Sequence, residues 1–371
     1  MTLELKSVAK QVDGVTHIHP TDLTLEPGSF NVLLGTTLSG KTTLMQLMAG
    51  LERPTGGQVW FGGRDVTGVS VQKRNVSMVY QQFINYPNLS VYGNIASPLK
   101  LARIDKLEID RRVREMAELM RLTPMLDRRP SELSGGQQQR TAMARALVKD
   151  ADLVLLDEPL ANLDFKLREE MRDELPRLFA NRNCIAVYAT TEPMEALLFG
   201  GNTATLHEGR VTQFGPTMQS YQQPVDLVSA QVFSEPPMNV AEVVKSGDGF
   251  TLGDDARWTA DTSTRDLDDG SYLLGVRPHR VTITAEGAQP VAIEGRVRIA
   301  ELSGSESTVH FDMLDRNWVS LSSGVHDFDI GATARFHMDV SRAMYFDRAG
   351  QLVGAAGGRT GPVAAADGGI G

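Results

Sequence analysis

The chain has 371 residues, which exceeds the usual span of one domain and makes two domains the default expectation. Hydrophobic residues make up 41% and charged residues 22%, as in ordinary folded proteins, which excludes disorder throughout. The net charge of -9 opposes general attraction to nucleic-acid phosphates or to anionic lipid.

The start of the chain and its single cysteine bear on its compartment. No apolar run reaches the roughly 18 residues that a membrane-spanning helix needs, and the first ten residues carry charges where a signal peptide would be apolar. We therefore expect the chain to stay in the cytoplasm. Cys184 lies in an apolar run and cannot form an internal disulfide, so we expect a buried structural thiol in preference to a reactive one.

Residues 1–215 have an alternating pattern of short apolar strands and helical stretches, which predicts an α/β domain with a largely parallel sheet covered by helices. A strand-like stretch at residues 30–34 leads into a loop that fits the pattern G-x-x-x-x-G-K-[ST] and is followed by a helical stretch. The loop residues are Gly35, Thr36, Thr37, Leu38, Ser39, Gly40, Lys41 and Thr42, and we count Thr43 with them as nucleotide-binding. Backbone N–H groups of such a loop point at phosphate oxygens, Lys41 adds a positive charge, and the Thr42 hydroxyl reaches Mg²⁺.

Residues 88–150 are predicted to form a helical subdomain. Ile109, Val113, Met116 and Met120 recur at helical spacing, which gives one apolar face opposite a charged one.

Residues 133–140 read LSGGQQQR and open another helical stretch. Ser134, Gly135, Gly136 and Gln137 form its start, where the free N–H groups of a helix N-terminus can bind an anion. Taken alone, the string would be an N-capped helix start and nothing more.

Residues 153–158 form a buried strand that ends in two carboxylates. Open α/β sheets place ligand chemistry at this end of their strands. We expect Asp157 to hold the Mg²⁺ shell and Glu158 to polarise an attacking water. Two surface acids after a core strand are the alternative interpretation.

The second half of the chain has a different pattern. Residues 216–240 contain four prolines that interrupt any long regular element and are predicted to be a linker. Residues 241–353 are predicted to form a β-barrel domain, since Val291, Ile293, Val297 and Ile299 alternate with polar residues, as do Val309, Phe311 and Met313. Residues 354–371 have almost no bulky side chains and are predicted to be a disordered tail.

The order of these motifs resembles that of the nucleotide-binding subunits of ABC transporters. The phosphate loop is similar to a Walker A motif, residues 133–137 to the LSGGQ signature, residues 153–158 to a Walker B motif, and residues 161–164, which include Asn162, to a D-loop. The resemblance implies that two subunits sandwich two ATP molecules, each phosphate loop facing the signature of the other subunit. It also implies that Gln81, as the Q-loop glutamine, joins Mg²⁺ and the attacking water to the helical subdomain.

Segments in the second half are similar to the C-terminal regulatory barrel, an OB-like domain of the TOBE type, of carbohydrate-importer ATPases such as that for maltose. They are SEPPMN at 234–239, GVRPH at 275–279 and MYFDRAGQLV at 344–353. Two stretches in the first half, HIHPTDLTLEPG and MVYQQFINYPNLSVYGNIASPL, resemble an ATPase subunit of bacterial glycerol importers. The resemblance implies a peripheral protein at the cytoplasmic face of the inner membrane, with a second ATPase subunit, two permease subunits and, indirectly, a periplasmic binding protein as partners, and no nucleic acid.

Three positions depart from the family pattern, and all three belong to the same nucleotide site. Thr191 replaces the switch histidine, Val12 stands where an aromatic residue would stack on adenine, and Leu38 replaces a third glycine of the phosphate loop. Base stacking on an aromatic ring is worth roughly 1 to 3 kcal/mol in nucleic-acid sites, so nucleotide binding here is expected to be weaker. His17 or His19 could compensate, although two surface histidines are the favoured interpretation.

These departures leave several functions open. One is a heterodimeric motor in which the site of this chain hydrolyses slowly, and another is a homodimer with ordinary turnover. A weak subunit that completes the ATP site of its partner is compatible with transport. The remaining alternative, a soluble ABC ATPase that remodels nucleic acid or ribosomes, is disfavoured because that group usually carries two fused cassettes or long coiled-coil insertions.

Overall fold

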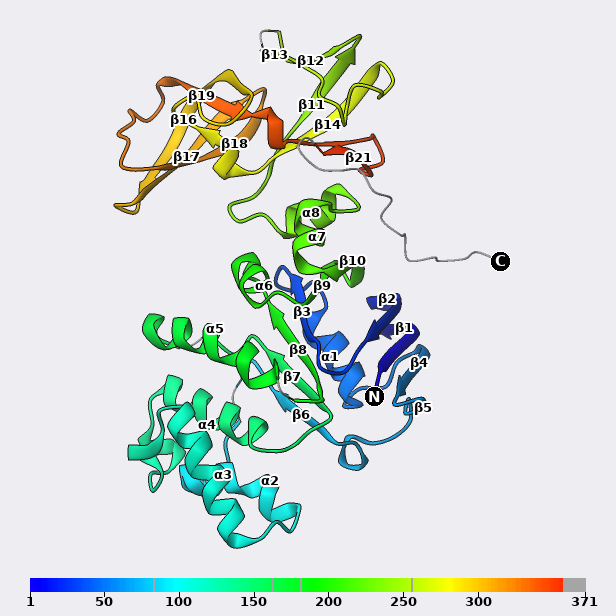
Figure 1. The fold of residues 1–371 in the computed structure, drawn as a ribbon, viewed down its shortest axis with the longest axis vertical. Coiled ribbons are helices and arrows are strands. Elements are labelled where there is room, and N and C mark those ends of the chain that lie inside the picture. The colour runs from blue at the N-terminus through cyan, green and yellow to red at the C-terminus, as the bar shows by residue number, and fades with distance from the viewer. Residues whose placement is uncertain (83, 162, 181, 255, 356–371) are drawn as a thin grey trace. The chain divides into compact units, whose positions relative to one another are not determined.

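The computed structural model describes residues 1–82, 84–161, 163–180, 182–254 and 256–355 (Figure 1). It divides into two units, Met1–Thr217 and Met218–Gly371, next to the boundary predicted at residue 215. None of the helices in the described stretches is long and apolar enough to cross a membrane.

A six-stranded sheet with the strand order β10-β9-β3-β8-β7-β6 forms the centre of the first unit. Its strands are β3 (Phe30–Gly35), β6 (Val76–Val79), β7 (Leu153–Asp157), β8 (Ile185–Thr190), β9 (Asn202–His207) and β10 (Arg210–Pro216). All of its strand pairs are parallel except β9 with β10. Every residue of β3, β7 and β8 is buried, as expected for strands of a parallel sheet that is covered on both faces. The predicted α/β class and largely parallel sheet are confirmed.

A smaller antiparallel sheet of the first unit has the strand order β2-β1-β4-β5. Its strands are β1 (Leu3–Val12), β2 (Val15–Leu25), β4 (Gly56–Phe61) and β5 (Arg64–Asp65). Asp13 and Gly14 connect β1 to β2 with positive φ angles of 50° and 81°. Asp-Gly is the favoured pair for such a two-residue hairpin turn, which brings Val12 opposite Val15.

The helices of the first unit follow its strands. They are α1 (Lys41–Ala49), α2 (Val91–Leu101), α3 (Lys106–Leu119), α4 (Gly135–Leu147), α5 (Phe165–Ala180) and α6 (Pro193–Phe199), with short 3₁₀ turns at Val71–Lys73, Thr123–Met125 and Pro130–Glu132. Figure 1 shows α2, α3 and α4 gathered together, within the range predicted as a helical subdomain. Ile109, Val113, Met116 and Met120 are all buried, which confirms the predicted apolar face of α3.

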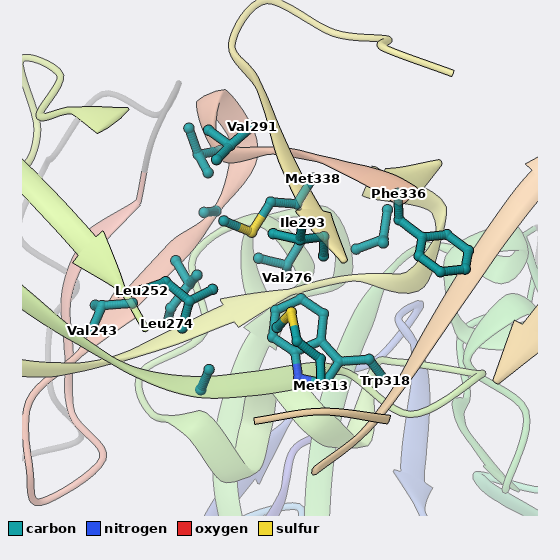
Figure 2. Packing of buried hydrophobic residues seen from close by; sticks show 14 of the residues in the cluster. Val243, Leu252, Leu274, Val276, Val291, Ile293, Met313, Trp318, Phe336 and Met338 are labelled. Carbon is teal, nitrogen blue, oxygen red and sulfur yellow. The ribbon is translucent and has the colours of Figure 1, made fainter. Parts of the chain in front are cut away.

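The second unit is built mainly of strands, and its core consists of buried side chains from two antiparallel sheets (Figure 2). One sheet contains β11 (Asn239–Ser246), β12 (Gly249–Leu252), β13 (Ala256–Thr259), β14 (Gly270–Val276), β20 (Met344–Phe346) and β21 (Leu352–Ala355). The other contains β15 (Val281–Thr282), β16 (Pro290–Leu302), β17 (Glu306–Met313), β18 (Arg316–Ser323) and β19 (Thr333–Asp339). The 3₁₀ turns are Pro278–Arg280 and Val340–Arg342. The predicted all-β class of this half is confirmed.

Most of the predicted alternation in the second unit is found, with one error. Val291, Ile293 and Val297 are buried, as are Val309, Phe311 and Met313, but Ile299 is exposed. The register of β16 against β17 shifts between Val297 and Ile299, and such a bulge turns the following side chains to the other face. The prediction that Ile299 points into the core was therefore wrong.

The ends of the second unit differ in detail from the predicted boundaries. Two six-residue helices, α7 (Thr217–Gln222) and α8 (Leu227–Val232), lie within the range predicted as a linker, and β11 begins inside it at Asn239. Strand β21 extends to Ala355, two positions beyond the predicted end of the barrel at residue 353. The rest of the predicted tail, residues 356–371, lies outside the described residues.

Candidate functional site

The phosphate loop connects β3 to α1 and has an unusual backbone. Gly40 has a φ of 103°, and a Cβ atom there would come within 2.8 Å of Ile18 Cδ1, so glycine is required. Leu38 also has a positive φ, of 66°, and its side chain is 96% exposed. A residue with a Cβ atom is strained at such an angle, which a glycine at this position would adopt freely.

Lys41 is the first residue of α1, and its side chain folds back over the loop that precedes it. Its Nζ donates to the carbonyl oxygens of Gly35 at 2.8 Å and Thr36 at 3.0 Å, and it lies 3.6 Å from Glu158 Oε1. Burial lowers the pKa of Lys41, while the neighbouring Glu158 carboxylate acts in the opposite direction. The lysine thus brings a partly desolvated positive charge to the loop.

Thr42 meets the end of β7 directly. Its hydroxyl donates to Asp157 Oδ2 at 2.8 Å, and Asp157 is only 2% exposed. Burial raises the pKa of Asp157, and the hydrogen bond from Thr42 opposes that shift. A hydroxyl and a buried carboxylate side by side form the oxygen-only donor pair that Mg²⁺ prefers, so these residues fit the ion.

Glu158 follows β7 with a φ of 46°, a conformation that few residues other than glycine adopt. Its amide donates to the Ala189 carbonyl at 3.0 Å, and Gln81 Nε2 donates to its Oε2 at 3.0 Å. The amide of Gln81 therefore holds one carboxylate oxygen of Glu158, while Lys41 lies near the other.

A cavity of about 580 Å³ opens between these groups. It is lined by Val15, Thr16, His17, Thr37, Leu38, Gly40, Lys41, Thr42, Thr43, Gln81, Glu158, Glu208 and Gly209. The structure thus brings together most of the predicted loop residues with Gln81 and Glu158. Gly35 and Ser39 also lie close together, so that a Cβ atom on Gly35 would come within 2.5 Å of Ser39 Oγ.

Four of the cavity residues were not predicted from the sequence. Val15 and Thr16 begin β2, and Glu208 and Gly209 form the turn after β9. The turn reaches the loop through the backbone, since the Gly209 amide donates to the Ser39 carbonyl at 2.9 Å. No local pattern marks these residues, because they meet the loop only through the pairing of distant strands.

Two of the three positions that depart from the family pattern do not line the cavity. Val12 is 40% exposed at the end of β1 and does not line the cavity, although its cross-strand partner Val15 does. Thr191 follows β8 and also lies outside the cavity lining. The roles predicted for these two positions stay predictions.

The LSGGQ segment forms the start of α4. Ser134 is the N-cap, with its Oγ accepting from the Gln137 amide at 3.4 Å, and Gln137 Oε1 accepts from the Ser134 amide at 3.0 Å. Ser134 and Gly135 are exposed, and Gly136 and Gln137 are half-buried. The segment therefore presents a capped helix N-terminus at the surface. Asn162 of the predicted D-loop lies outside the described residues.

Comparisons with family models match both halves of the chain. Residues 18–161 match the model described as ABC transporter, and residues 274–346 match the TOBE domain. A solved dimeric structure of an ATP-binding cassette in a post-hydrolysis state, bound to ADP and Pi, is 27% identical with a TM-score of 0.54 and covers 58% of this chain and 98% of that chain.

Curated relatives match nearly the full length of the chain. The sn-glycerol-3-phosphate import ATP-binding protein UgpC of Pectobacterium atrosepticum is 34% identical over 348 residues, 93% of this chain and 97% of that protein. The alpha-glucoside transport ATP-binding protein AglK of Rhizobium meliloti is 35% identical over 357 residues, 94% and 98% of the two chains. The trehalose/maltose import ATP-binding protein MalK of Thermococcus litoralis is 37% identical over 324 residues, 83% and 87%. The chain belongs to the ATP-binding subunits of ABC transporters, in the carbohydrate-importer branch.

Proposed function

We propose that the chain binds ATP and Mg²⁺ in the cavity between the phosphate loop and the end of β7, and hydrolyses the ATP to drive an importer. The observation that carries this proposal is the convergence of three separate segments on one cavity. Thr42 reaches Asp157, Lys41 reaches Glu158, and Gln81 holds Glu158 from a third segment. A purified chain that fails to bind ATP in the presence of MgCl₂ would refute it.

The side chains divide the chemistry between them. Bound Mg²⁺ would supply positive charge next to the phosphate oxygens, held by Thr42 and Asp157 with Gln81 nearby. Lys41 would turn from the loop carbonyls to the phosphate, and the loop amides would bind its oxygens. Glu158, oriented by the Gln81 amide, would accept a proton from the attacking water, a contribution worth roughly 10² to 10⁴ in rate.

We further propose that the chain works as part of a larger complex. The exposed start of α4, Ser134 to Gln137, would face the ATP held by a second ATPase subunit, of the same or another sequence. Two permease subunits and, indirectly, a periplasmic binding protein would complete the importer, with this chain peripheral at the cytoplasmic face of the inner membrane. The second unit would serve as a regulatory domain. The net charge of -9 supports protein partners over nucleic acid.

For the cargo, we propose a small polyol or sugar, with glycerol as the specific candidate. Glycerol is supported by the stretches HIHPTDLTLEPG and MVYQQFINYPNLSVYGNIASPL. The names of the relatives add sn-glycerol-3-phosphate, alpha-glucosides and trehalose or maltose as alternatives. Cargo-stimulated ATP hydrolysis by the reconstituted importer decides between them: stimulation by the phosphate ester or a sugar, and not by glycerol, would overturn the glycerol assignment.

The two ATP sites of the complex are proposed to be unequal. Leu38 lines the site that contains Lys41, and the family pattern assigns Val12 and Thr191 to the same site, whereas the LSGGQ segment is intact. Glu158→Gln should then lower the ATP hydrolysis of a heterodimer only slightly. Ser134→Arg, which acts on the ATP of the partner, should lower it severely. Vanadate trapping on the purified complex provides a direct test, because equal labelling of both ATPase chains would exclude the asymmetry.

A further inference from the structure

A network of charged side chains surrounds the Thr190–Glu192 segment of the first unit. Arg168 and Arg172 lie one turn apart on α5 and both face Glu192. Arg172 Nη2 lies 2.5 Å from Glu192 Oε2, and Arg168 Nη1 lies 3.7 Å from Glu192 Oε1. None of these three side chains lines the nucleotide cavity in the described structure.

Glu195, which is 4% exposed, holds the same segment through hydrogen bonds. Its Oε2 accepts from Tyr188 at 2.9 Å and from Thr190 at 2.6 Å, and its Oε1 accepts from Arg172 Nε at 3.3 Å. Thr190 Oγ1 in turn accepts from the Glu192 amide at 3.0 Å. The residues on both sides of Thr191 are therefore held by side-chain hydrogen bonds, so the position of Thr191 is fixed by its neighbours.

Arg168 also contacts the segment that follows Glu158. Its Nη2 donates to the carbonyl oxygens of Ala161 at 3.2 Å and Leu163 at 3.4 Å. The Ala161 amide donates to the Glu158 carbonyl at 3.3 Å, which ties this contact to the proposed general base. One guanidinium group thus spans two chain segments, and its planar fork suits such simultaneous contacts.

We infer that Arg168 is a positioning residue that couples the Thr190–Glu192 segment to the segment carrying Glu158. This inference rests on the proposed hydrolysis of ATP at Glu158. Since Arg168 lies outside the cavity lining, its loss should displace Glu158 and Thr191 without removing a nucleotide contact. Misplacing a catalytic group by about 1 Å can cost as much as 100-fold in rate, so we expect the kcat of the site in this chain to fall about 10-fold with its KM nearly unchanged.

The test is a double-mutant cycle on the assembled complex with Arg168→Gln, Glu192→Gln and both together. Arg177→Gln is the matched control, because Arg177 lies on the same helix, is 72% exposed and pairs with Glu174. Vanadate trapping on this chain reports the turnover of its own site. Each single variant should lower that turnover about 10-fold, and the double variant should be no slower than the slower single one. The coupling is overturned if the losses of the two single variants multiply in the double variant. It is also overturned if Arg168→Gln turns over as fast as the wild type, or if Arg177→Gln loses as much as Arg168→Gln.

Amide hydrogen exchange on the nucleotide-free protein separates this inference from the proposed function. Both Arg168→Gln and Glu192→Gln should speed exchange in the peptide that contains Ala161 and Leu163, whereas Arg177→Gln should leave it unchanged. If Glu192→Gln does not change the exchange of the peptide that contains Ala161 and Leu163, the coupling is refuted, even if ATP is hydrolysed. Absence of hydrolysis by the wild-type complex refutes the proposed function, and the exchange result still decides whether the two segments are coupled.

Discussion

The Thr42 hydroxyl lies 2.8 Å from Asp157 Oδ2 and joins the start of α1 to the end of β7, across 115 positions of the chain. Asp157 is nearly inaccessible to solvent, so water does little to stabilise its negative charge. Function and stability therefore make opposite demands on this carboxylate.

Replacing Thr42 by valine should weaken the use of Mg²⁺. The substitution keeps the shape of the side chain and removes the hydroxyl next to Asp157, so we expect ATP hydrolysis at the site of this chain to fall roughly 10- to 100-fold at low Mg²⁺. Hydrolysis measured over a MgCl₂ titration should recover in part at high Mg²⁺. Thr333→Val, at an exposed strand position, is the control. An unchanged Mg²⁺ dependence in Thr42→Val would remove this residue from the proposed metal shell.

Asp157→Asn should stabilise the nucleotide-free protein at neutral pH. The folded pKa is raised by burial, so the folded chain binds the carboxyl proton more tightly than the unfolded chain, and stability falls as pH rises through the interval from about 3.9 to the raised value. Asparagine removes this loss and can still accept from Thr42. We expect a gain of about 2 °C or more in the unfolding temperature at pH 7.5.

Calorimetry at several pH values checks the Asp157 prediction. The advantage of Asp157→Asn over the wild type should shrink as the pH is lowered towards 4, because the native aspartate then becomes protonated. Asp327→Asn, at an exposed aspartate, should show no such pattern. A variant that unfolds at a lower temperature than the wild type at pH 7.5 would contradict the burial argument.

The sequence was a good guide wherever a contact is local or follows from the order of strands. The phosphate loop, the carboxylates at the end of β7 and the apolar face of α3 each occupy a continuous stretch, and parallel strands bring their carboxyl ends together. Thr42 and Asp157 could be placed near each other for that reason.

Contacts that depend on strand register or on non-local pairing were beyond the sequence. Glu208 reaches the cavity only because the turn after β9 meets the phosphate loop through the Gly209 amide. Ile299 was misplaced because a bulge in β16 interrupts the alternation, and a bulge leaves no mark in the hydrophobic pattern. Arg168 was missed for a similar reason, since a charged residue on a helix surface has the same pattern whether or not it meets a distant loop.

Leu38→Gly should leave the protein as stable as the wild type or more stable. The left-handed conformation at φ 66° costs a leucine about 1 to 2 kcal/mol, and glycine adopts it freely. The greater freedom of glycine in the unfolded chain offsets about 0.5 to 1 kcal/mol of that gain. Because the Leu38 side chain is exposed, no packing is lost.

Denaturant unfolding with two further variants makes the Leu38 prediction specific. Leu38→Val should lower the unfolding free energy by about 1 kcal/mol, since a β-branched residue is worse at a positive φ. Leu107→Gly, at another exposed leucine but within α3, should also lower it by about 1 kcal/mol. If Leu38→Gly destabilises as much as Leu107→Gly does, the strain at Leu38 is absent.

An aromatic residue at the tip of the β1-β2 hairpin should tighten the binding of ATP. Val12 and Val15 are paired across the hairpin, and side chains directly opposite each other share a face of the sheet. Val15 lines the cavity, so a tyrosine at Val12 would lie beside that rim and offer the base a ring to stack on. A gain of roughly 1 to 3 kcal/mol corresponds to about 5- to 150-fold in Kd.

Titration calorimetry with ATP and with tripolyphosphate, which has no base, distinguishes stacking from a general effect. Val12→Tyr should tighten ATP binding and leave tripolyphosphate binding unchanged, because the ring contacts only the base. Val15→Tyr serves as the neighbouring comparison and Val325→Tyr, at an exposed position of the second unit, as the control. If Val15→Tyr tightens ATP binding and Val12→Tyr does not, the base contacts the start of β2 instead of the end of β1. An equal gain for both ligands would mean that the missing aromatic residue is not what limits the affinity of this site for ATP.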